Sequence, residues 1–102
     1  MRLQILHVPD CPGARLLRAR LADMVAAGPG IQVMWQVVAT ENTAARLGMT
    51  GSPTILADGR DLFAGPGLVP SLSCRLYPDE NGRPGPAPTA GQLRRALRLA
   101  GG

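Results

Sequence analysis

The sequence predicts a single α/β domain, and three observations lead to that prediction. The chain has 102 residues, 45% of them hydrophobic, which suffices for one modest core. Short β-rich segments alternate with segments whose apolar residues recur at three- and four-residue spacing. Glycines and prolines separate most of these segments. We therefore expect the order strand, helix, strand, helix, two strands and a final helix.

The first half of the chain is expected to form two strand–helix units. Residues 3–8 make a short apolar strand, and residues 14–27 carry the leucine spacing of a helix that a Gly-Pro-Gly sequence ends. The near-continuous apolar character of residues 31–38 is typical of a central strand covered on both faces. A short helix over residues 40–47 follows, and Gly48 ends it.

The second half is expected to begin with a hairpin and to end with a helix. Pro53 opens a strand at residues 54–57, and an Asp-Gly pair predicts a turn into a second strand at residues 61–64. Residues 92–99 form the last helix, with Thr89 as its cap. Three leucines of this helix are expected to face the core: Leu93, Leu97 and Leu99.

Residues 65–88 form a long loop that follows neither pattern. Ten of these 24 residues are glycine or proline, and the apolar piece SLSCRLYP contains Cys74. A loop of this length is usually functional or disordered. Folded over the face that carries Cys11 and Pro53, the loop would bring Cys74 toward Cys11. In the alternative, Cys74 packs as a small hydrophobe against the sheet edge.

Cys11 is the residue that most clearly indicates chemistry. It lies in HVPDCPGARLLRARL, between an apolar strand and an amphipathic helix, and Pro12 suits the first helical turn. The free N–H groups and the positive dipole end at the start of a helix favour a thiolate over a thiol. The alternative is a half-buried structural cysteine that precedes a helix.

The composition excludes several classes of protein. All eleven basic residues are arginines, the net charge is +4, and only 3% of the residues are aromatic. Scattered arginines without aromatic platforms do not make a nucleic-acid surface. No apolar stretch has the roughly 20 residues of a membrane span, and the N-terminus lacks the features of a signal peptide. We therefore expect a cytoplasmic protein, in which two cysteines indicate chemistry more than a structural disulfide.

Two segments together resemble the thioredoxin-like superfamily. The first is the strand–turn–Cys-Pro–helix unit around Cys11. The second is ENTAARLGMTGSPTILADGRDLF, a helix and a small-residue turn followed by a proline and a strand hairpin. The segment TAGQLRRALRLA resembles the closing helix, so the resemblance covers most of the chain outside residues 65–88. It implies a thioredoxin-like three-layer α/β fold, with a central mixed sheet of about four strands flanked by helices and a cis Pro53 facing Cys11.

The resemblance also implies a function and a site. Cys11 would be the single nucleophilic thiol of an oxidoreductase or thiol-transfer protein. Pro12, Ser52, Pro53 and Thr54 would bind the substrate, a small thiol or disulfide or a protein, with backbone groups of Ser52 pairing with it. No cofactor is implied beyond an external low-molecular-weight thiol.

The sequence departs from this family at one functional position. Thioredoxins and dithiol glutaredoxins carry Cys-x-x-Cys, whereas Ala14 occupies the place of the second cysteine. A dithiol protein resolves its mixed disulfide with that second sulfur. This chain must therefore use an external thiol or the distant Cys74.

Two polar residues lie close to Cys11 in the sequence. His7, near the end of the first strand, is either a base or soft-metal ligand or a partly buried polar neighbour. Asp10 is expected to cap the helix, because aspartate accepts N–H bonds well at that position. As an alternative, Asp10 would serve as a proton donor beside the sulfur.

Two further functions are compatible with these residue types. Protonolysis of a carbon–mercury bond requires two thiolates and a carboxylic acid, so Cys11, Cys74 and Asp10 would form the trio that organomercurial lyases use. The other function is a non-catalytic binding module that keeps the groove near Pro53. The sequence favours the oxidoreductase over the binding module because Cys11 is retained at the start of the helix.

Overall fold

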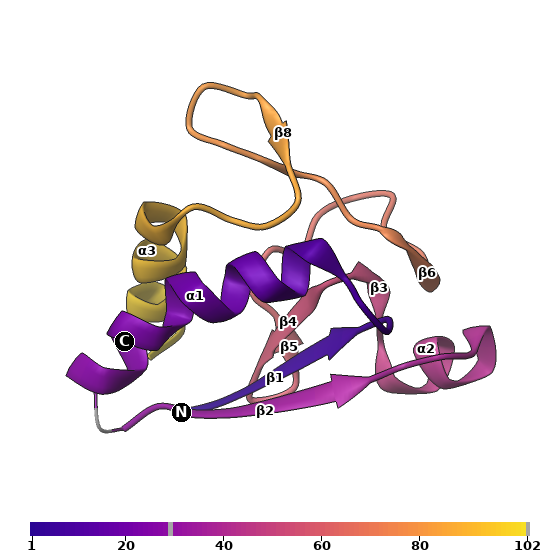
Figure 1. Ribbon diagram of the computed structural model, residues 1–102, viewed down its shortest axis with the longest axis horizontal. Helices are drawn as coiled ribbons and strands as arrows, with labels where there is room; N and C mark the ends of the chain where they lie inside the picture. The colour runs from indigo at the N-terminus through magenta and orange to yellow at the C-terminus, as the bar shows by residue number, and fades with distance from the viewer. Residues whose placement is uncertain (29, 102) are drawn as a thin grey trace.

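A mixed four-stranded sheet in the order β2-β1-β4-β5 forms the centre of the computed structural model (Figure 1). β1 (Arg2–His7) pairs in parallel with β2 (Gln32–Val37) and antiparallel with β4 (Thr54–Ala57). β4 continues through a tight turn into β5 (Arg60–Asp61), a shorter strand than predicted. The predicted α/β class with a mixed sheet of four strands is confirmed.

The structure describes residues 1–28 and 30–101. Pro29, which the sequence analysis placed in the break after the first helix, lies outside the described residues. Within the described residues, no helix is both long enough and apolar enough to cross a membrane.

Three helices cover the sheet. α1 (Pro12–Ala27) and α3 (Ala90–Gly101) lie side by side over one face, as Figure 1 shows. α2 (Glu41–Leu47) packs against the opposite face through Ala44, which belongs to a second core cluster. The sheet therefore has helices on both sides.

The ends of α2 and α3 follow local capping rules, and the end of α2 at Gly48 and the cap of α3 at Thr89 were predicted from the sequence. The Thr40 hydroxyl accepts the N–H of Thr43 at 3.2 Å, and Gly48 ends α2 in a left-handed conformation at φ +83°. The Thr89 hydroxyl accepts the N–H of Gln92 at 3.1 Å, and the Gln92 side chain accepts the Thr89 N–H in return. This reciprocal pair is a capping box, so the predicted cap of α3 is confirmed.

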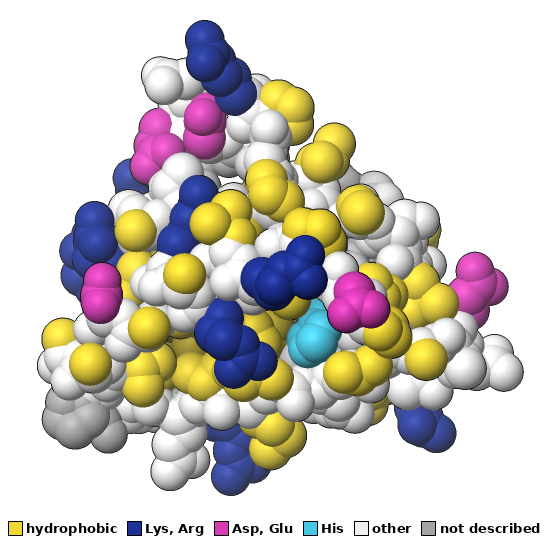
Figure 2. Space-filling model, viewed as in Figure 1, with side chains coloured by type: hydrophobic (Ala, Val, Ile, Leu, Met, Phe, Trp, Pro, Cys, Tyr) yellow, Lys and Arg dark blue, Asp and Glu magenta, His cyan; other side chains and the backbone are white. Residues whose placement is uncertain are grey.

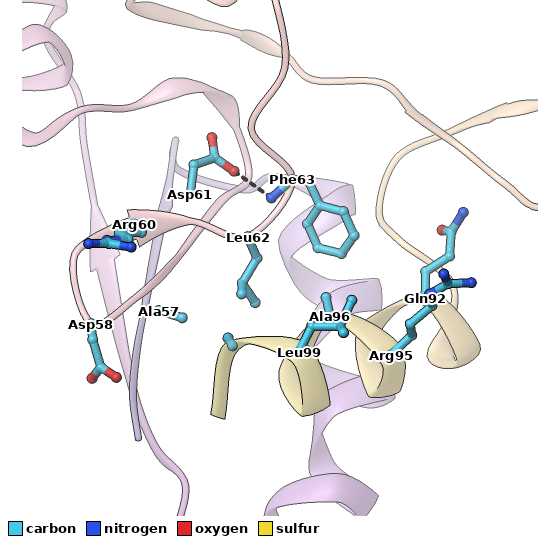
Figure 3. A pocket seen from close by; sticks show the side chains of 11 residues that line it. Ala57, Asp58, Arg60, Asp61, Leu62, Phe63, Gln92, Arg95, Ala96 and Leu99 are labelled. Atoms are coloured by element: carbon cyan, nitrogen blue, oxygen red, sulfur yellow. Dashed lines mark hydrogen bonds between the residues drawn. The ribbon is translucent and has the colours of Figure 1, made fainter. Parts of the chain in front are cut away.

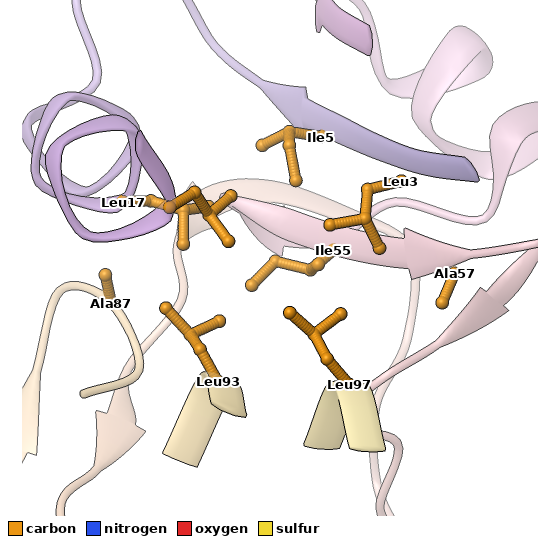
Figure 4. Packing of buried hydrophobic residues seen from close by; sticks show 9 residues of the cluster. Leu3, Ile5, Leu17, Ile55, Ala57, Ala87, Leu93 and Leu97 are labelled. Atoms are coloured by element: carbon orange, nitrogen blue, oxygen red, sulfur yellow. The ribbon is translucent and has the colours of Figure 1, made fainter. Parts of the chain in front are cut away.

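Alternation along β1 and β4 divides the core between the two faces of the sheet. Ile5 lies opposite Ile55, and both point toward α1 and α3 (Figure 4). Leu6 and Leu56 have the opposite parity and contribute to the cluster beneath α2. The larger cluster consists of Leu3, Ile5, Leu17, Leu21, Ile55, Ala57, Ala87, Leu93 and Leu97.

β2 lies at the edge of the sheet, so the predicted central position of residues 31–38 is wrong. Alternate residues of the strand are exposed, and Met34 and Val37 are among the large apolar side chains that face solvent. β1 takes the central place instead, and three of its residues are fully buried. A continuous apolar run does not show whether a strand lies at the edge or the centre of a sheet. That position depends on which other strands pair with it, and the local sequence does not specify those strands.

Residues 65–88 contain more regular secondary structure than their composition predicted. β6 (Ser71–Cys74) pairs in parallel with β3 (Thr50–Ser52), a short strand that the sequence analysis had treated as a turn. β7 (Tyr77–Pro78) and β8 (Pro84–Gly85) form a small antiparallel ribbon. The predicted loop is therefore joined to β3 by backbone pairing at β6 and has a small ribbon of its own.

The last helix tests the core assignment directly. Leu93 is fully buried, whereas Leu99, which was expected to face inward, is 73% exposed. Leu93→Ala should lower the free energy of unfolding by about 2–5 kcal/mol, because it removes buried methyl groups and leaves a cavity. Leu99→Ala is the matched control and should change it by less than about 0.5 kcal/mol. Urea unfolding of both variants measures the difference, and equal losses would contradict this packing.

Candidate functional site

Cys11 is the N-cap residue of α1. Its backbone is extended, its carbonyl accepts the N–H of Arg15 at 3.2 Å, and Pro12 follows at the first helical position. The predicted capping role of Asp10 is therefore wrong. Asp10 lies one residue before the cap, in a left-handed conformation at φ +56°, and is exposed. A cap residue needs an extended backbone, which Asp10 does not have.

The sulfur of Cys11 contacts the side chain of Ser52. The Ser52 hydroxyl accepts the backbone N–H of Val8 at 3.0 Å and donates to the Cys11 Sγ at 3.0 Å. Cys11 is 5% exposed and Ser52 is 2% exposed. Because the Val8 N–H occupies an acceptor position on the hydroxyl, the Ser52 proton is directed at the sulfur. A hydrogen bond of this kind is stronger when the acceptor carries negative charge.

The peptide bond between Ser52 and Pro53 is cis, as predicted. Pro53 lies against the start of α1, since a Cβ added at Gly13 would be 2.9 Å from the Cδ of Pro53. The turn before β4 and the start of α1 are therefore in contact. This contact is what places Ser52 beside the sulfur.

A cavity of about 260 Å³ lies beside Cys11, and both cysteines line it. Residues 11–13 at the start of α1 line it on one side, β3 contributes Ser52, and residues 74–76 and 84–86 supply the rest. The segment 65–88 therefore lies against the Cys11 face, as predicted. Both cysteines are free thiols.

Cys74 is exposed, so the alternative in which it packs as a buried hydrophobe is wrong. Its neighbours Arg75 and Tyr77 are buried instead, at 7% and 4% exposure. Residues 74–77 alternate between exposed and buried, so Cys74 lies on the side away from the buried Arg75 and Tyr77.

Arg75 anchors the segment that carries Cys74, and the sequence analysis did not identify it. Its guanidinium forms an ion pair with Asp61, with 2.8 Å between Nη1 and Oδ2. It also donates to the Phe63 carbonyl at 2.8 Å and to the Thr50 hydroxyl at 3.1 Å. The one sequence signal was an arginine inside an apolar piece, and arginines are usually exposed.

Tyr77 lies beside Arg75 and contacts the turn at Pro53. Its hydroxyl donates to the carbonyl of Pro53, and the guanidinium of Arg75 lies 4.8 Å from its ring centroid. Burial raises the pKa of Tyr77 above its usual range. The charge of Arg75 lowers that pKa in part, while the charges of Asp61 and Cys11 raise it further.

Two of the predicted substrate-binding residues, Pro53 and Thr54, have structural roles in the fold. Pro53 and Thr54 are fully buried, and neither is among the residues that line the cavity of the two cysteines. The Thr54 hydroxyl donates to the Gly51 carbonyl at 2.6 Å and accepts the Thr50 N–H at 3.1 Å. These two residues build the turn that positions Ser52 and do not face the cavity.

The structure brings together two members of the proposed mercury-binding trio. Cys11 and Cys74 share a cavity, and Asp10 is not among the residues that line it. Residues 1–28 and 30–101 contain no group of three or more histidine, cysteine, aspartate or glutamate side chains placed to hold a metal. His7 contacts the Val8 carbonyl through Nδ1 at 2.9 Å and packs edge-on against Trp35, with 6.2 Å between ring centroids.

The backbone of Ser52 already has a partner within the chain. Its carbonyl accepts the N–H of Arg75 at 3.0 Å, and Ser52 lies opposite Cys74 in the β3–β6 pair. One of the two backbone groups predicted to pair with a substrate, the Ser52 carbonyl, is therefore already hydrogen-bonded within the chain. The Ser52 side chain, in contrast, faces the cavity and the sulfur.

A second cavity, of about 810 Å³, lies between the β4–β5 hairpin and α3 (Figure 3). Phe63 and Leu62 line one side, and Arg95 and Gln92 line the other. Neither cysteine lines it.

Figure 2 shows the arginines of the viewed face dispersed among apolar and neutral side chains.

Comparisons with protein-family models, with curated proteins and with solved structures found no match to this chain. The chemistry of the site is therefore inferred from its own residues.

The contact between α1 and residues 84–86 can be tested at Gly13. A Cβ at this position would overlap the carbonyl oxygen of Pro86. Glycine to alanine in a helix ordinarily adds up to about 1 kcal/mol of stability, but here we expect a loss of about 1–3 kcal/mol from overpacking. Gly65→Ala is the control, because nothing lies within 4 Å of its added Cβ. A stabilised Gly13→Ala variant in urea unfolding would contradict the contact.

The buried hydroxyl of Tyr77 predicts a fall in stability at high pH. The unfolded chain loses its tyrosine proton near pH 10, whereas the folded chain keeps it because burial raises the pKa of Tyr77. Stability is therefore complete below about pH 10 and decreases as the pH rises further.

Tyr77→Phe tests this pH dependence. The variant should lose about 1 kcal/mol at neutral pH, because the Pro53 carbonyl loses its donor. Its stability should then decline less steeply than that of the wild type above about pH 10. The chain has one tyrosine and no lysine, so few other groups titrate in this range. Urea unfolding at a series of pH values measures both slopes, and parallel curves would contradict the assignment.

Proposed function

We propose that this chain is a thiol-dependent oxidoreductase or thiol-transfer protein of thioredoxin-like fold, with Cys11 as its nucleophile. The observation that carries the proposal is the shared cavity of two free thiols, one of them at a helix start and hydrogen-bonded to the Ser52 hydroxyl. The backbone dipoles of α1 and the Ser52 proton both stabilise negative charge on the Cys11 sulfur.

The arrangement of the chain supports the fold in this proposal. The sheet is mixed and four-stranded, α1 and α3 cover one face, and α2 covers the other. The cis peptide before Pro53 adjoins the start of α1. A mixed sheet of about four strands flanked by helices, and a cis proline near Cys11, are what the resemblance around Cys11 and GSPT implies.

The reaction proceeds by two exchanges at sulfur. The Cys11 thiolate attacks a disulfide R–S–S–R, forms a mixed disulfide with one half and releases the other half as a thiolate. The Cys74 thiolate then attacks the Cys11 sulfur, forms the Cys11–Cys74 disulfide and releases the second half. The two protein thiols lose two electrons and two protons, and the substrate disulfide becomes two thiols.

Cys74 is the resolving thiol in this scheme because Ala14 removes the local one. Cys74 lies opposite Ser52 in the β3–β6 pair, and the Ser52 side chain contacts the Cys11 sulfur. An external low-molecular-weight thiol returns the pair to the dithiol form by the reverse exchanges.

Cysteine variants test this assignment. A small disulfide at low protein concentration should give an intramolecular Cys11–Cys74 bond in the wild type, identified by mass mapping of the two thiols. Cys74→Ser should stop at a mixed disulfide on Cys11, and Cys11→Ser should lose the exchange activity entirely.

Labelling by a small alkylating agent at neutral pH provides the control for the identity of the nucleophile. Cys11 should react faster than Cys74 despite its lower exposure, because Cys11 lies at a helix start and accepts the Ser52 hydroxyl proton. Labelling of Cys74 alone, with no disulfide exchange at Cys11, would contradict the proposal and favour a non-catalytic binding module.

A further inference from the structure

We propose that the substrates of Cys11 are small disulfides and not disulfides carried in extended peptide segments. This inference rests on the proposed function and specifies its substrate class. Three observations carry it: an occupied strand edge, a buried anchor that holds the occupant, and a small cavity beside the sulfur.

The strand edge beside the sulfur is occupied by the chain itself. An extended peptide binds a strand by hydrogen bonding to an unpaired edge. β3, which carries Ser52, pairs in parallel with β6, and the Ser52 carbonyl accepts the N–H of Arg75. A peptide that approached Cys11 along the edge of β3 that pairs with β6 would first have to displace β6.

β6, which occupies this edge, is held in place by the side chain of Arg75, the residue that follows the strand. Arg75 makes the buried ion pair with Asp61 and reaches two further acceptors from the same guanidinium. The backbones also approach closely, since a Cβ on Gly51 would lie 2.7 Å from the Cβ of Arg75. Removing one partner of a buried ion pair leaves the other charge buried and uncompensated, so the Arg75–Asp61 contact opposes the release of β6.

The cavity itself admits a small group. Pro84, Gly85 and Pro86 line it on the side away from Ser52, and Pro86 lies against Gly13 at the start of α1. Its volume of about 260 Å³ lies below the roughly 300–1,000 Å³ of sites for drug-sized ligands. Arg75 is the one charged residue among the described residues that line it, and Asp61 neutralises that charge. A compact, uncharged disulfide matches these dimensions and this lining.

The rate of the first exchange tests the inference. Cys74→Ser leaves Cys11 as the single thiol, so mixed-disulfide formation reports its attack alone. The two substrates are bis(2-hydroxyethyl) disulfide and the disulfide-linked dimer of a short extended peptide with a central cysteine. Each rate is divided by the rate of the same disulfide with free dithiothreitol, which removes differences in intrinsic reactivity.

We expect the normalised rate of the small disulfide to exceed that of the peptide by at least about ten-fold. Equal rates, or a faster peptide, would overturn this inference and leave the proposed function standing. No mixed disulfide with either substrate would overturn the proposed function and this inference with it.

A variant that releases β6 provides the second measurement. Arg75→Met keeps an unbranched apolar side chain and removes the ion pair, and it should raise the normalised peptide rate about ten-fold while changing the small-disulfide rate much less. Arg83→Met, an exposed arginine of the same segment, is the matched control and should leave both rates unchanged. A folded Arg75→Met variant with an unchanged peptide rate would overturn the role of β6. If that variant does not fold, the wild-type amide N–H of Arg75 must still exchange slowly, and rapid exchange would overturn the occupied edge.

Discussion

The buried ion pair between Arg75 and Asp61 is the interaction on which the candidate site depends. It joins the end of the β4–β5 hairpin to the residue that follows Cys74, and so fixes the strand that covers β3. Taking both charges out of water is costly, and the cost is offset because the guanidinium also reaches the Phe63 carbonyl and the Thr50 hydroxyl. This anchor adds to the backbone pairing of β6 with β3 and to the hydrogen bond from Tyr77 to the Pro53 carbonyl, which hold the same glycine- and proline-rich segment.

The site combines parts with different structural origins. Cys11 comes from the start of a helix that packs on the larger core cluster, so its position is set by the best-buried part of the molecule. Ser52 comes from a turn whose conformation is held by the hydroxyl of Thr54 and by contact with Tyr77 at Pro53. Cys74 alone is exposed and comes from the long segment. A rigid nucleophile beside a more accessible second thiol suits two successive exchanges at sulfur.

Elements defined by local chemistry were predictable from the sequence. The end of α2 at Gly48 and the cap of α3 at Thr89 depend on neighbouring residues only, and both were found where predicted. The contact between Cys11 and the turn at Pro53 came from a resemblance, because no local rule joins residues 41 positions apart. Asp10 shows the opposite case, because aspartate is a residue type that often caps helices, but the left-handed backbone of Asp10 prevents it from acting as the cap of α1.

The sequence by itself determined the alternation of strands and helices, the cap of α3, and the placement of a thiol at a helix start, because each depends on side chains within a few residues. The tertiary structure alone decided that β2 is an edge strand, that Cys74 is exposed, and that Arg75 is buried. These outcomes depend on which distant segments pair, and on whether a charge finds its partner within the fold. The apolar run of β2 and the charge of Arg75 both indicated the wrong environment, since neither carries information about its eventual neighbours.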